Sequence, residues 1–291
     1  MKIAAYIFQG EPGVGLVTDD LQGVRPVELQ LHERKLGALP LVMALARGDA
    51  LPACGPILAL DKVRLTAPLP RARRNIFCVG KNYHAHAREF AGSGFDSSAK
   101  SGGDIPAHPI IFTKVPECVI GPHDTIVMPM GVSSAIDYEA ELAVVIGHGG
   151  KGIKAADAMK HVWGYTIVND VTARDWQSRH QQWDMGKSFD TFCPMGPWLV
   201  SADECDGTAT QVRCWVNGEE RQNASTKDLI FDIPTLIETL SAGITLYPGD
   251  VIATGTPVGV GIGFTPPKYL KAGDVVRVAI DGIGAIENPV R

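Results

Sequence analysis

Short apolar segments separated by turn residues run along most of the chain, and they predict a protein built mainly of strands. At the N-terminus, residues 2–8 have the pattern of a short strand, residues 10–13 that of a turn, and residues 14–17 that of a hairpin partner. A helix is expected at about residues 36–47, and the proline-containing segment 67–70 has the composition of a linker. We therefore expect a small N-terminal α/β domain at residues 1–70 and a larger domain at residues 71–291.

The last third of the chain repeats the strand pattern. Short strands are expected at residues 211–216, 251–254 and 275–280, with turn residues between them and a helix at 233–241. Together with the N-terminal pattern, this predicts an α+β fold.

Three carboxylates at alternating positions precede an apolar run in Asp137-Tyr-Glu139-Ala-Glu141-Leu-Ala-Val-Val-Ile146. Side chains alternate between the two faces of a strand, so all three are expected on one face. Repulsion between such close charges costs on the order of 1–4 kcal/mol per pair at a protein surface, and a divalent cation is the usual remedy. The stretch therefore predicts half of a metal site.

A second apolar strand, at residues 162–168, stops at Asn169-Asp170. Asp170 thus lies at a strand end, where a third metal ligand is expected. Carboxylates without a nearby His or Cys make an all-oxygen site, which favours Mg²⁺, Mn²⁺ or Ca²⁺ over Zn²⁺.

A candidate base follows the buried strand expected at residues 75–80. If the next segment is helical, His86 and Glu89 lie three residues apart on one face, and the carboxylate orients the imidazole. The alternative is a solvated helix face. The run at residues 91–103 is rich in Gly and Ser, so it is either a lid beside this base or an ordinary surface loop.

Further polar groups lie downstream. Arg174 and Gln177 fall within one helical turn and suit a carboxylate or keto oxygen. Gly186-Lys187-Ser188 lacks the glycine that a phosphate loop needs at position 181, which is Gln181. A lone lysine is usually a solvated surface charge, but Gly186 and the apolar segment 189–196 flank Lys187, so we expect it to be partly buried. The glycine-rich run 254–263 does not fit a dinucleotide motif, and it is either a backbone nest for a carboxylate or a tight buried turn.

Composition narrows the class of protein. The 291 residues hold 27 basic and 32 acidic side chains, a net charge of -5, and no Lys/Arg-rich run, which disfavours nucleic-acid and anionic-membrane partners. No apolar run reaches the roughly 18 residues of a membrane span. The six cysteines show no C-x-x-C spacing and the N-terminus has no signal-peptide pattern, so we expect reduced thiols in the cytoplasm.

Taken together, five ordered motifs resemble the fumarylacetoacetate hydrolase family, and the resemblance spans about residues 75–291. They are Gly-Lys-Asn-Tyr-x-x-His-x-x-Glu (80–89), Asp-Tyr-Glu-x-Glu-Leu (137–142), Asn-Asp-Val-Thr-Ala-Arg-Asp-x-Gln (169–177), Gly-Lys-Ser-Phe-Asp (186–190) and Thr-Gly-Thr-Pro-x-Gly-Val-Gly (254–261). The resemblance implies a mixed β-sandwich roll, a homodimer, and Mg²⁺ or a similar cation held by Glu139, Glu141 and Asp170.

The pattern is most similar to the acylpyruvase and 2-hydroxyhepta-2,4-diene-1,7-dioate isomerase branch. The larger fumarylacetoacetases have an additional upstream acidic ligand without a clear counterpart here, which disfavours fumarylacetoacetate as the substrate. Asp137 is then expected to support the site by pairing with a basic side chain such as Arg174 or Lys187.

The main hypothesis is a metal-dependent hydrolase that cleaves a C–C bond of an acylpyruvate-type keto acid through an enolate. His86, oriented by Glu89, is expected to activate water, and Lys187 to stabilise negative charge. The residues expected to bind the small anionic substrate are Arg174, Gln177, Tyr83 and Thr256. The alternatives are an oxaloacetate decarboxylase or tautomerase, an isomerase or decarboxylase of an unsaturated dicarboxylate in aromatic catabolism, or a catalytically silent binding module.

Overall fold

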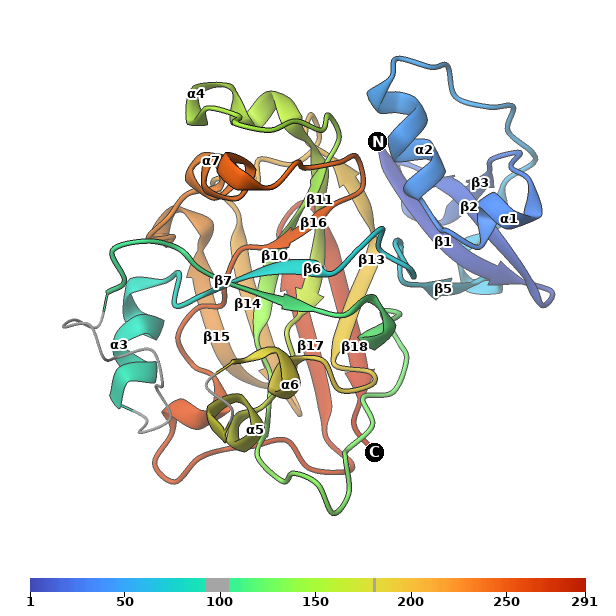
Figure 1. Ribbon diagram of the computed structural model, residues 1–291. Coiled ribbons are helices and arrows are strands. Elements are labelled where there is room, and N and C mark those ends of the chain that lie inside the picture. The colour runs from blue at the N-terminus through green and yellow to red at the C-terminus, as the bar shows by residue number, and fades with distance from the viewer. Residues whose placement is uncertain (93–104, 180–181) are drawn as a thin grey trace.

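The computed structural model describes residues 1–92, 105–179 and 182–291 (Figure 1). The fold is α+β and rich in mixed sheet, as predicted, and it is compatible with the β-roll that the family resemblance implies. The expected lid at residues 91–103 lies outside the described residues, apart from the backbone of its first two positions, which end a helix.

The largest sheet in the described part of the chain has 12 strands. Its strands follow, in sheet order, as β4 (Leu58–Ala59), β3 (Gly23–Pro26), β2 (Glu11–Val17), β1 (Lys2–Phe8), β13 (Cys193–Ser201), β11 (Val162–Asn169), β10 (Ala140–Ile146), β16 (Val251–Ala253), β6 (Ile76–Gly80) and β7 (Ile110–Lys114). In addition, β5 (Arg64–Thr66) pairs with β1, and β8 (Val119–Ile120) pairs with β13.

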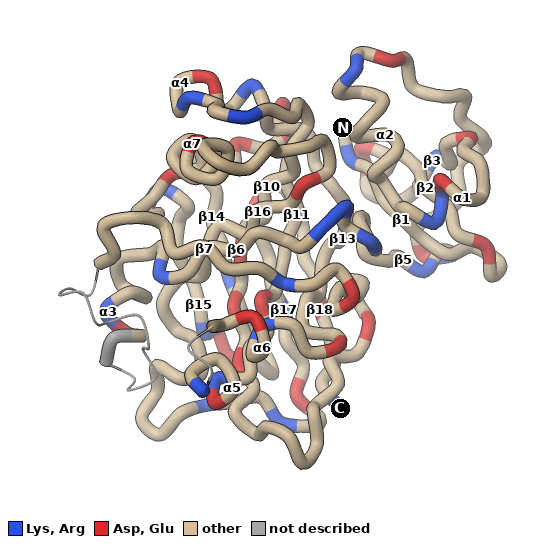
Figure 2. Tube along the Cα trace, in the orientation of Figure 1, with Lys and Arg blue, Asp and Glu red and all other residues tan. Residues whose placement is uncertain are grey.

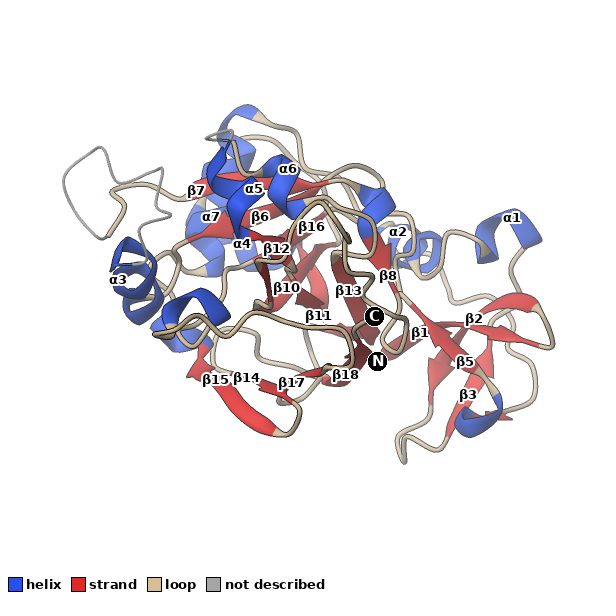
Figure 3. Ribbon diagram, turned by 90° about the horizontal axis from the view of Figure 1, so that it is seen from below, coloured by secondary structure: helices blue, strands red, loops and turns tan. Residues whose placement is uncertain are grey.

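A second sheet of four strands packs against the first (Figure 3). It runs in the order β15 (Glu219–Ser225), β14 (Gln211–Val216), β17 (Val275–Ile280) and β18 (Gly284–Pro289), and a separate pair joins β12 (Thr172–Ala173) to β9 (Ile136–Asp137). The strands expected at 211–216 and 275–280 are confirmed, as is the one at 251–254 to within one residue.

The helices are short and lie around the sheets. They are α1 (Leu31–Arg34), α2 (Leu39–Ala46), α3 (His84–Gly92), α4 (Ala155–Ala158), α5 (Arg174–Arg179), α6 (Asp184–Lys187) and α7 (Ile233–Gly243). Single 3₁₀ turns occur at η1 (Leu60–Lys62), η3 (Pro116–Cys118), η4 (Met159–His161), η5 (Thr226–Asp228) and η6 (Gly261–Gly263). None of the described helices is long and apolar enough to cross a membrane.

Strand β10 lies at the centre of the protein and is buried on both faces. Leu142 and Val144 belong to the core shared with the second sheet, whereas Ala143 and Val145 face a separate apolar cluster. This double burial explains why the run is continuously apolar rather than alternating. The only charge inside β10 is Glu141, close to its first residue, and it therefore lies near the end of the core rather than in its middle.

The N-terminal part projects beside the main body (blue, Figure 1), yet it is hydrogen-bonded to that body. Strand β1 pairs with β13 through Lys2 and Val200, and Leu41 of α2 shares an apolar cluster with Ile76 of β6. The helix expected at 36–47 is found as α2. One sheet contains strands from both sides of residue 70. The division of the chain into two domains at this residue stays a prediction.

Basic and acidic residues are interspersed along the trace (Figure 2). Those that matter for the site are the buried carboxylates and cations near the ends of β7, β10 and β11.

Candidate active site

Glu139, Glu141 and Asp170 come together as a carboxylate triad. One oxygen from each lies within 4.8 Å of the others, and all three side chains are buried. Strands β10 and β11 are antiparallel, with Ala140 opposite Asn169, so the start of one strand meets the end of the other. The backbone N–H of Asp170 donates to the carbonyl of Glu139 at 2.8 Å, which fixes the two ligand positions side by side.

Asp137 does not lie on a common strand face with Glu139 and Glu141, so this expectation is wrong. Strand β9 ends at Asp137, and β10 begins only at Ala140, because the backbone leaves the sheet between them. The Asp137 carboxylate accepts bonds from Arg174 Nε at 2.9 Å and from the backbone N–H groups of Gly261 and Ile262 at 2.6 and 2.9 Å. The expected pairing of Asp137 with Arg174 is confirmed.

Three buried cations surround the triad. Lys187 Nζ lies 2.8 Å from Glu139 Oε2 and 2.8 Å from Asp170 Oδ2, and Arg174 Nη1 lies 2.7 Å from Glu139 Oε1. The third is Lys114, at the end of β7, whose Nζ lies 2.7 Å from Asp170 Oδ1 and also donates to the carbonyl oxygen of Lys187. The sequence analysis missed Lys114, although a lysine closing an apolar strand was a usable signal.

The charge balance of this cluster suits a divalent cation. Ion pairs join Asp137, Glu139 and Asp170 to Lys114, Arg174 and Lys187, and Glu141 adds a fourth carboxylate. Glu141 accepts a hydrogen bond from the backbone N–H of Gly255 at 2.9 Å. Among the described residues Glu141 is the one carboxylate of these four without an ion pair, and three carboxylate ligands fit Mg²⁺, Mn²⁺ or Ca²⁺.

The two glutamates of the triad differ in their electrostatic environment. Burial opposes ionisation of Glu139, but Lys187 and Arg174 outweigh it and lower the pKa of Glu139 to about 2. Burial, together with the charges of Asp170 and Glu139, raises the pKa of Glu141 well above its ordinary value. A cation at the triad would remove this repulsion, because it binds the ionised form of Glu141.

His86 and Glu89 form the pair that their spacing on α3 predicts. His86 Nδ1 lies 3.0 Å from Glu89 Oε2, and Glu89 Oε1 accepts a bond from the backbone N–H of Gly259 at 3.0 Å. His86 is only 5% exposed, whereas His84 on the same helix is exposed. The alternative of a solvated helix face is therefore wrong for this pair.

The glycine-rich run 254–263 binds carboxylates, but they belong to the protein itself. Its backbone N–H groups at Gly255, Gly259 and Gly261 donate to Glu141, Glu89 and Asp137 respectively. Gly255 and Gly259 both have φ of +105°, a conformation that favours glycine. The run thus positions both sides of the site, and the nest expected for a ligand carboxylate is filled from within the chain.

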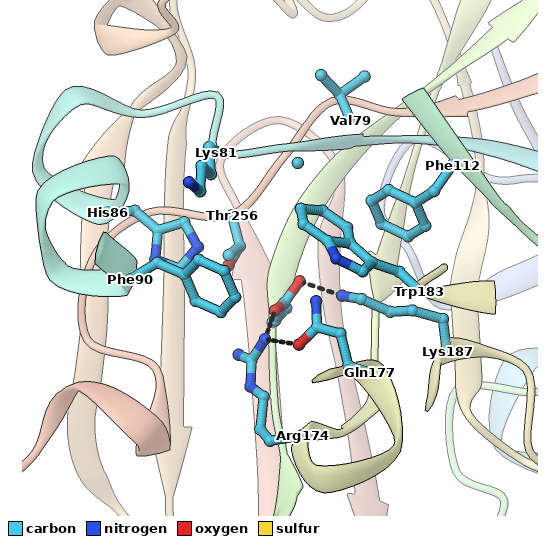
Figure 4. A pocket seen from close by; sticks show the side chains of 12 residues that line it. Val79, Lys81, His86, Phe90, Phe112, Arg174, Gln177, Trp183, Lys187 and Thr256 are labelled. Atoms are coloured by element: carbon cyan, nitrogen blue, oxygen red, sulfur yellow. Dashed lines mark hydrogen bonds and ion pairs between the residues drawn. The ribbon is translucent and has the colours of Figure 1, made fainter. Parts of the chain in front are cut away.

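A small cavity separates the imidazole from the triad (Figure 4). Its lining includes His86, Arg174, Gln177, Lys187 and Thr256, five of the residues expected to act on a substrate, together with Glu139. The lining residues that the sequence analysis missed are Val79, Gly80, Lys81, Phe90, Phe112 and Trp183. Val79, Gly80 and Lys81 lie at the end of β6 and just after it, whereas the three aromatic residues come from α3, β7 and the position before α6, which are far apart in the sequence.

Two of the residues expected to bind substrate, Thr256 and Tyr83, make other contacts in the structure. The Thr256 hydroxyl donates to the Ala140 carbonyl at 3.1 Å and accepts from Gln222 Nε2 at 2.8 Å. Tyr83 is buried and lines a different surface pocket, beside His84 and Lys227. Their roles in substrate binding stay predictions.

Arg174 and Gln177 lie close to each other at the bottom of the cavity. Gln177 Oε1 accepts from Arg174 Nη1 at 3.1 Å, and both side chains are buried. The other terminal nitrogen, Arg174 Nη2, is buried without a hydrogen-bond partner among the described residues. An unpaired buried guanidinium N–H is costly, so this nitrogen has donor capacity that no described group uses.

Residues 75–291 match the family described as fumarylacetoacetate (FAA) hydrolase C-terminal. The chain belongs to the fumarylacetoacetate hydrolase family. Across 314 aligned positions, covering all of both proteins, it is 46% identical to a protein of Bacillus subtilis (strain 168) named oxaloacetate tautomerase YisK. It is 45% identical to the human protein named oxaloacetate tautomerase FAHD2A, mitochondrial, over 83% of this chain and 74% of that protein.

Solved structures of the fumarylacetoacetate hydrolase family share the whole fold. A fumarylacetoacetate hydrolase from psychrophilic Exiguobacterium antarcticum is 39% identical with a TM-score of 0.85, covering 100% of this chain and 99% of that one. A 2-hydroxyhepta-2,4-diene-1,7-dioate isomerase from Mycobacterium marinum is 33% identical with a TM-score of 0.79, covering 100% and 98%. Because proteins described as hydrolase and as isomerase share this fold, the fold does not decide the reaction.

Proposed function

We propose that this family member is a metal-dependent oxaloacetate tautomerase, which interconverts the keto and enol forms of a four-carbon keto dicarboxylate. The observation that carries the proposal is the 46% identity to a protein of that name over the full length of both chains. Tautomerisation was an alternative in the sequence analysis. It now has better support than the main hypothesis, C–C bond hydrolysis.

Glu139, Glu141 and Asp170 are the residues that would hold the cation, and Mg²⁺ is the ion we propose. Their oxygen-only donor set, and the lack of an ion pair to Glu141 among the described residues, support this assignment. A divalent cation bound there would neutralise the negative charge that develops on the keto oxygen of the substrate.

His86 is the proposed proton carrier. Because Nδ1 is held by Glu89, the imidazole presents Nε2 as its acceptor. Nε2 takes a proton from the methylene carbon, the C–H electron pair becomes the new C=C bond, and the carbonyl electron pair moves onto oxygen. The protonated imidazole then returns its proton to that oxygen, so the enol forms without loss or gain of atoms.

The cationic side chains at the bottom of the cavity suit a doubly charged substrate. Arg174 Nη2 offers an unused donor, and Gln177 fixes the guanidinium through Nη1. Lys187 lies beside the triad and would stabilise negative charge on the substrate. Burial strengthens each of these interactions, because little water competes.

Hydrolysis and tautomerisation make different demands on this site. Hydrolysis needs an acylpyruvate and an attacking water together, whereas tautomerisation needs only the keto acid and the imidazole. Hydrolysis stays the second candidate, because an imidazole oriented by a carboxylate can also activate water.

The remaining expectations are part of the same proposal. We propose a homodimer in the cytoplasm, with residues 1–70 as a small domain beside the catalytic part. The six cysteines are free thiols, which is compatible with a reducing compartment.

The decisive experiment follows the ultraviolet absorbance of the enol of oxaloacetate as it decays to the keto form. With Mg²⁺ the protein should accelerate this decay over the buffer rate, and a chelator should remove the acceleration. Pyruvate is assayed in parallel with oxaloacetate and with acetylpyruvate, since decarboxylation and hydrolysis both produce it. Rapid pyruvate release without faster tautomerisation would reject the proposal in favour of the lyase or hydrolase reaction.

A further inference from the structure

Three aromatic rings from separate elements cover one side of the cavity. Phe90 belongs to α3, Phe112 to β7, and Trp183 immediately precedes α6. The Trp183 ring lies 5.2 Å from that of Phe112 and 6.1 Å from that of Phe90, both edge-to-face. Figure 4 shows these rings above Arg174, Gln177 and Lys187. The cavity is thus lined by polar and charged side chains on one side and by aromatic rings on the opposite side.

Gly80 provides the space that Trp183 occupies. A Cβ built on Gly80 would lie 2.2 Å from Cζ3 of the indole, far closer than two carbons approach. Gly80 has no positive φ, so its backbone conformation does not require glycine there. The missing side chain therefore serves the packing of the indole against the end of β6.

The indole is held by its packing on Phe90, Phe112 and Gly80. Next to it, Asp184 accepts a hydrogen bond from the Thr113 hydroxyl at 3.1 Å, which attaches the start of α6 to β7. A longer acid that enters the cavity on this side must displace the indole, which packs against both neighbouring rings and the backbone of Gly80.

We propose that Trp183, supported by Phe112, sets the length of the acid that this site accepts: it admits a short keto dicarboxylate and rejects acylpyruvates with longer acyl chains. The inference rests on the proposed function only in taking a 2-keto acid as the ligand. Trp183 is 8% exposed and lies beside β7, the last strand of its sheet, so removing the indole opens the cavity toward solvent.

The test compares the wild-type protein with the Trp183→Ala variant. Both are offered acylpyruvates of increasing chain length, and oxaloacetate is the short reference acid. Binding is measured by calorimetry with Mg²⁺, and turnover by the enol assay. In hydrophobic pockets one methylene changes selectivity about 10- to 200-fold. We expect Trp183→Ala to improve the affinity for the longer acids, relative to oxaloacetate, by about 10-fold or more.

Trp176→Ala is the matched control. Trp176 lies on neighbouring α5, packs on Phe189 at 5.4 Å and does not line the cavity. It should leave the ratio of affinities unchanged. If Trp183→Ala fails to fold, Phe112→Leu enlarges the same side of the cavity and should shift the ratio in the same direction. An unchanged ratio in the folded variant, or an equal shift in the control, would overturn the proposal.

A second pair of variants tests the contact itself. Gly80→Ala should weaken binding of oxaloacetate in the wild-type background, because the new methyl group pushes the indole into the cavity. In the Trp183→Ala background the same change should have little effect, since the obstructing ring is gone. Equal effects in both backgrounds would contradict the packing argument. Since binding needs no turnover, this result remains interpretable even if the protein fails to tautomerise oxaloacetate.

Discussion

The two sides of the cavity are built by different means. The carboxylate side rests on paired strands: β10 and β11 set Glu139, Glu141 and Asp170 by register, and Lys114 reaches them from β7. The imidazole side rests on the short helix α3. Its Glu89 is attached to the glycine-rich run through the Gly259 N–H.

Side-chain hydrogen bonds also anchor the start of α3. Asn82 Oδ1 accepts from the Phe231 N–H at 2.8 Å, and its Nδ2 donates to the Thr254 carbonyl at 2.8 Å. These bonds place the helix without linking His86 to the ion pairs of the triad. The comparison teaches that the two sides rest on different elements, which the glycine-rich run joins through Gly255 and Gly259. A variant on one side that leaves this run in place should therefore leave the other side intact.

The largest effect is expected from Asp170→Asn. The change removes a charged cation ligand and leaves Lys114 and Lys187 facing a neutral amide, which weakens two buried ion pairs at once. Mg²⁺ binding measured by calorimetry should be lost, and the enol assay should show activity reduced by roughly 1000-fold or more. Breaking a buried pair typically costs about 3–5 kcal/mol of unfolding free energy, so urea denaturation should show a less stable protein. Mg²⁺ binding at wild-type affinity would rule out Asp170 as a ligand.

His86→Gln should separate the two sides. Without the proton carrier, kcat should fall about 100- to 10,000-fold, while the Mg²⁺ affinity stays at the wild-type value because the triad is untouched. The control is His84→Gln, which changes an exposed histidine two residues away on the same helix. It should behave as wild type. A kcat that survives His86→Gln would assign proton transfer to another group.

Lys114→Met should have the smallest effect on activity and a clear effect on stability. Burial lowers the pKa of Lys114, but the Asp170 carboxylate outweighs it and raises that pKa above its ordinary value, so the pair is charged in the folded protein. Removing the lysine leaves a buried carboxylate short of a partner, at a cost of about 3–5 kcal/mol without Mg²⁺. Added Mg²⁺ should recover part of this loss, and activity at saturating Mg²⁺ should fall only about tenfold.

The control for Lys114→Met is Lys160→Met. Lys160 forms an equally short ion pair with Asp157, at 2.6 Å, but at the surface. Exposed pairs of this kind contribute little to stability, so urea denaturation should detect no change. If both variants lost stability to the same degree, or if Mg²⁺ recovered nothing in Lys114→Met, the link between Lys114 and the cation site would be refuted.

Much of the site could be predicted because it is encoded locally. His86 and Glu89 lie three residues apart on one helix, so their proximity follows from short-range geometry. The meeting of Glu139 and Glu141 with Asp170 depends in addition on the pairing of β10 with β11. The same reasoning failed at Asp137, because alternation holds only while the strand is continuous. The break between β9 and β10 depends on contacts with η6 and Arg174, which are far away in the sequence.

The sequence by itself determined the sheet-rich α+β class, the carboxylates and imidazole of the site, and the family. Only the tertiary structure decided that Lys114 pairs with Asp170 across 56 positions, that the glycine-rich run holds the protein's own carboxylates, and that Trp183 lies against Gly80. The physical reason is the separation along the sequence of the residues that interact. Helix and strand periodicity fixes neighbours a few residues apart, whereas buried ion pairs and ring packing form only when separate elements are brought together by the core.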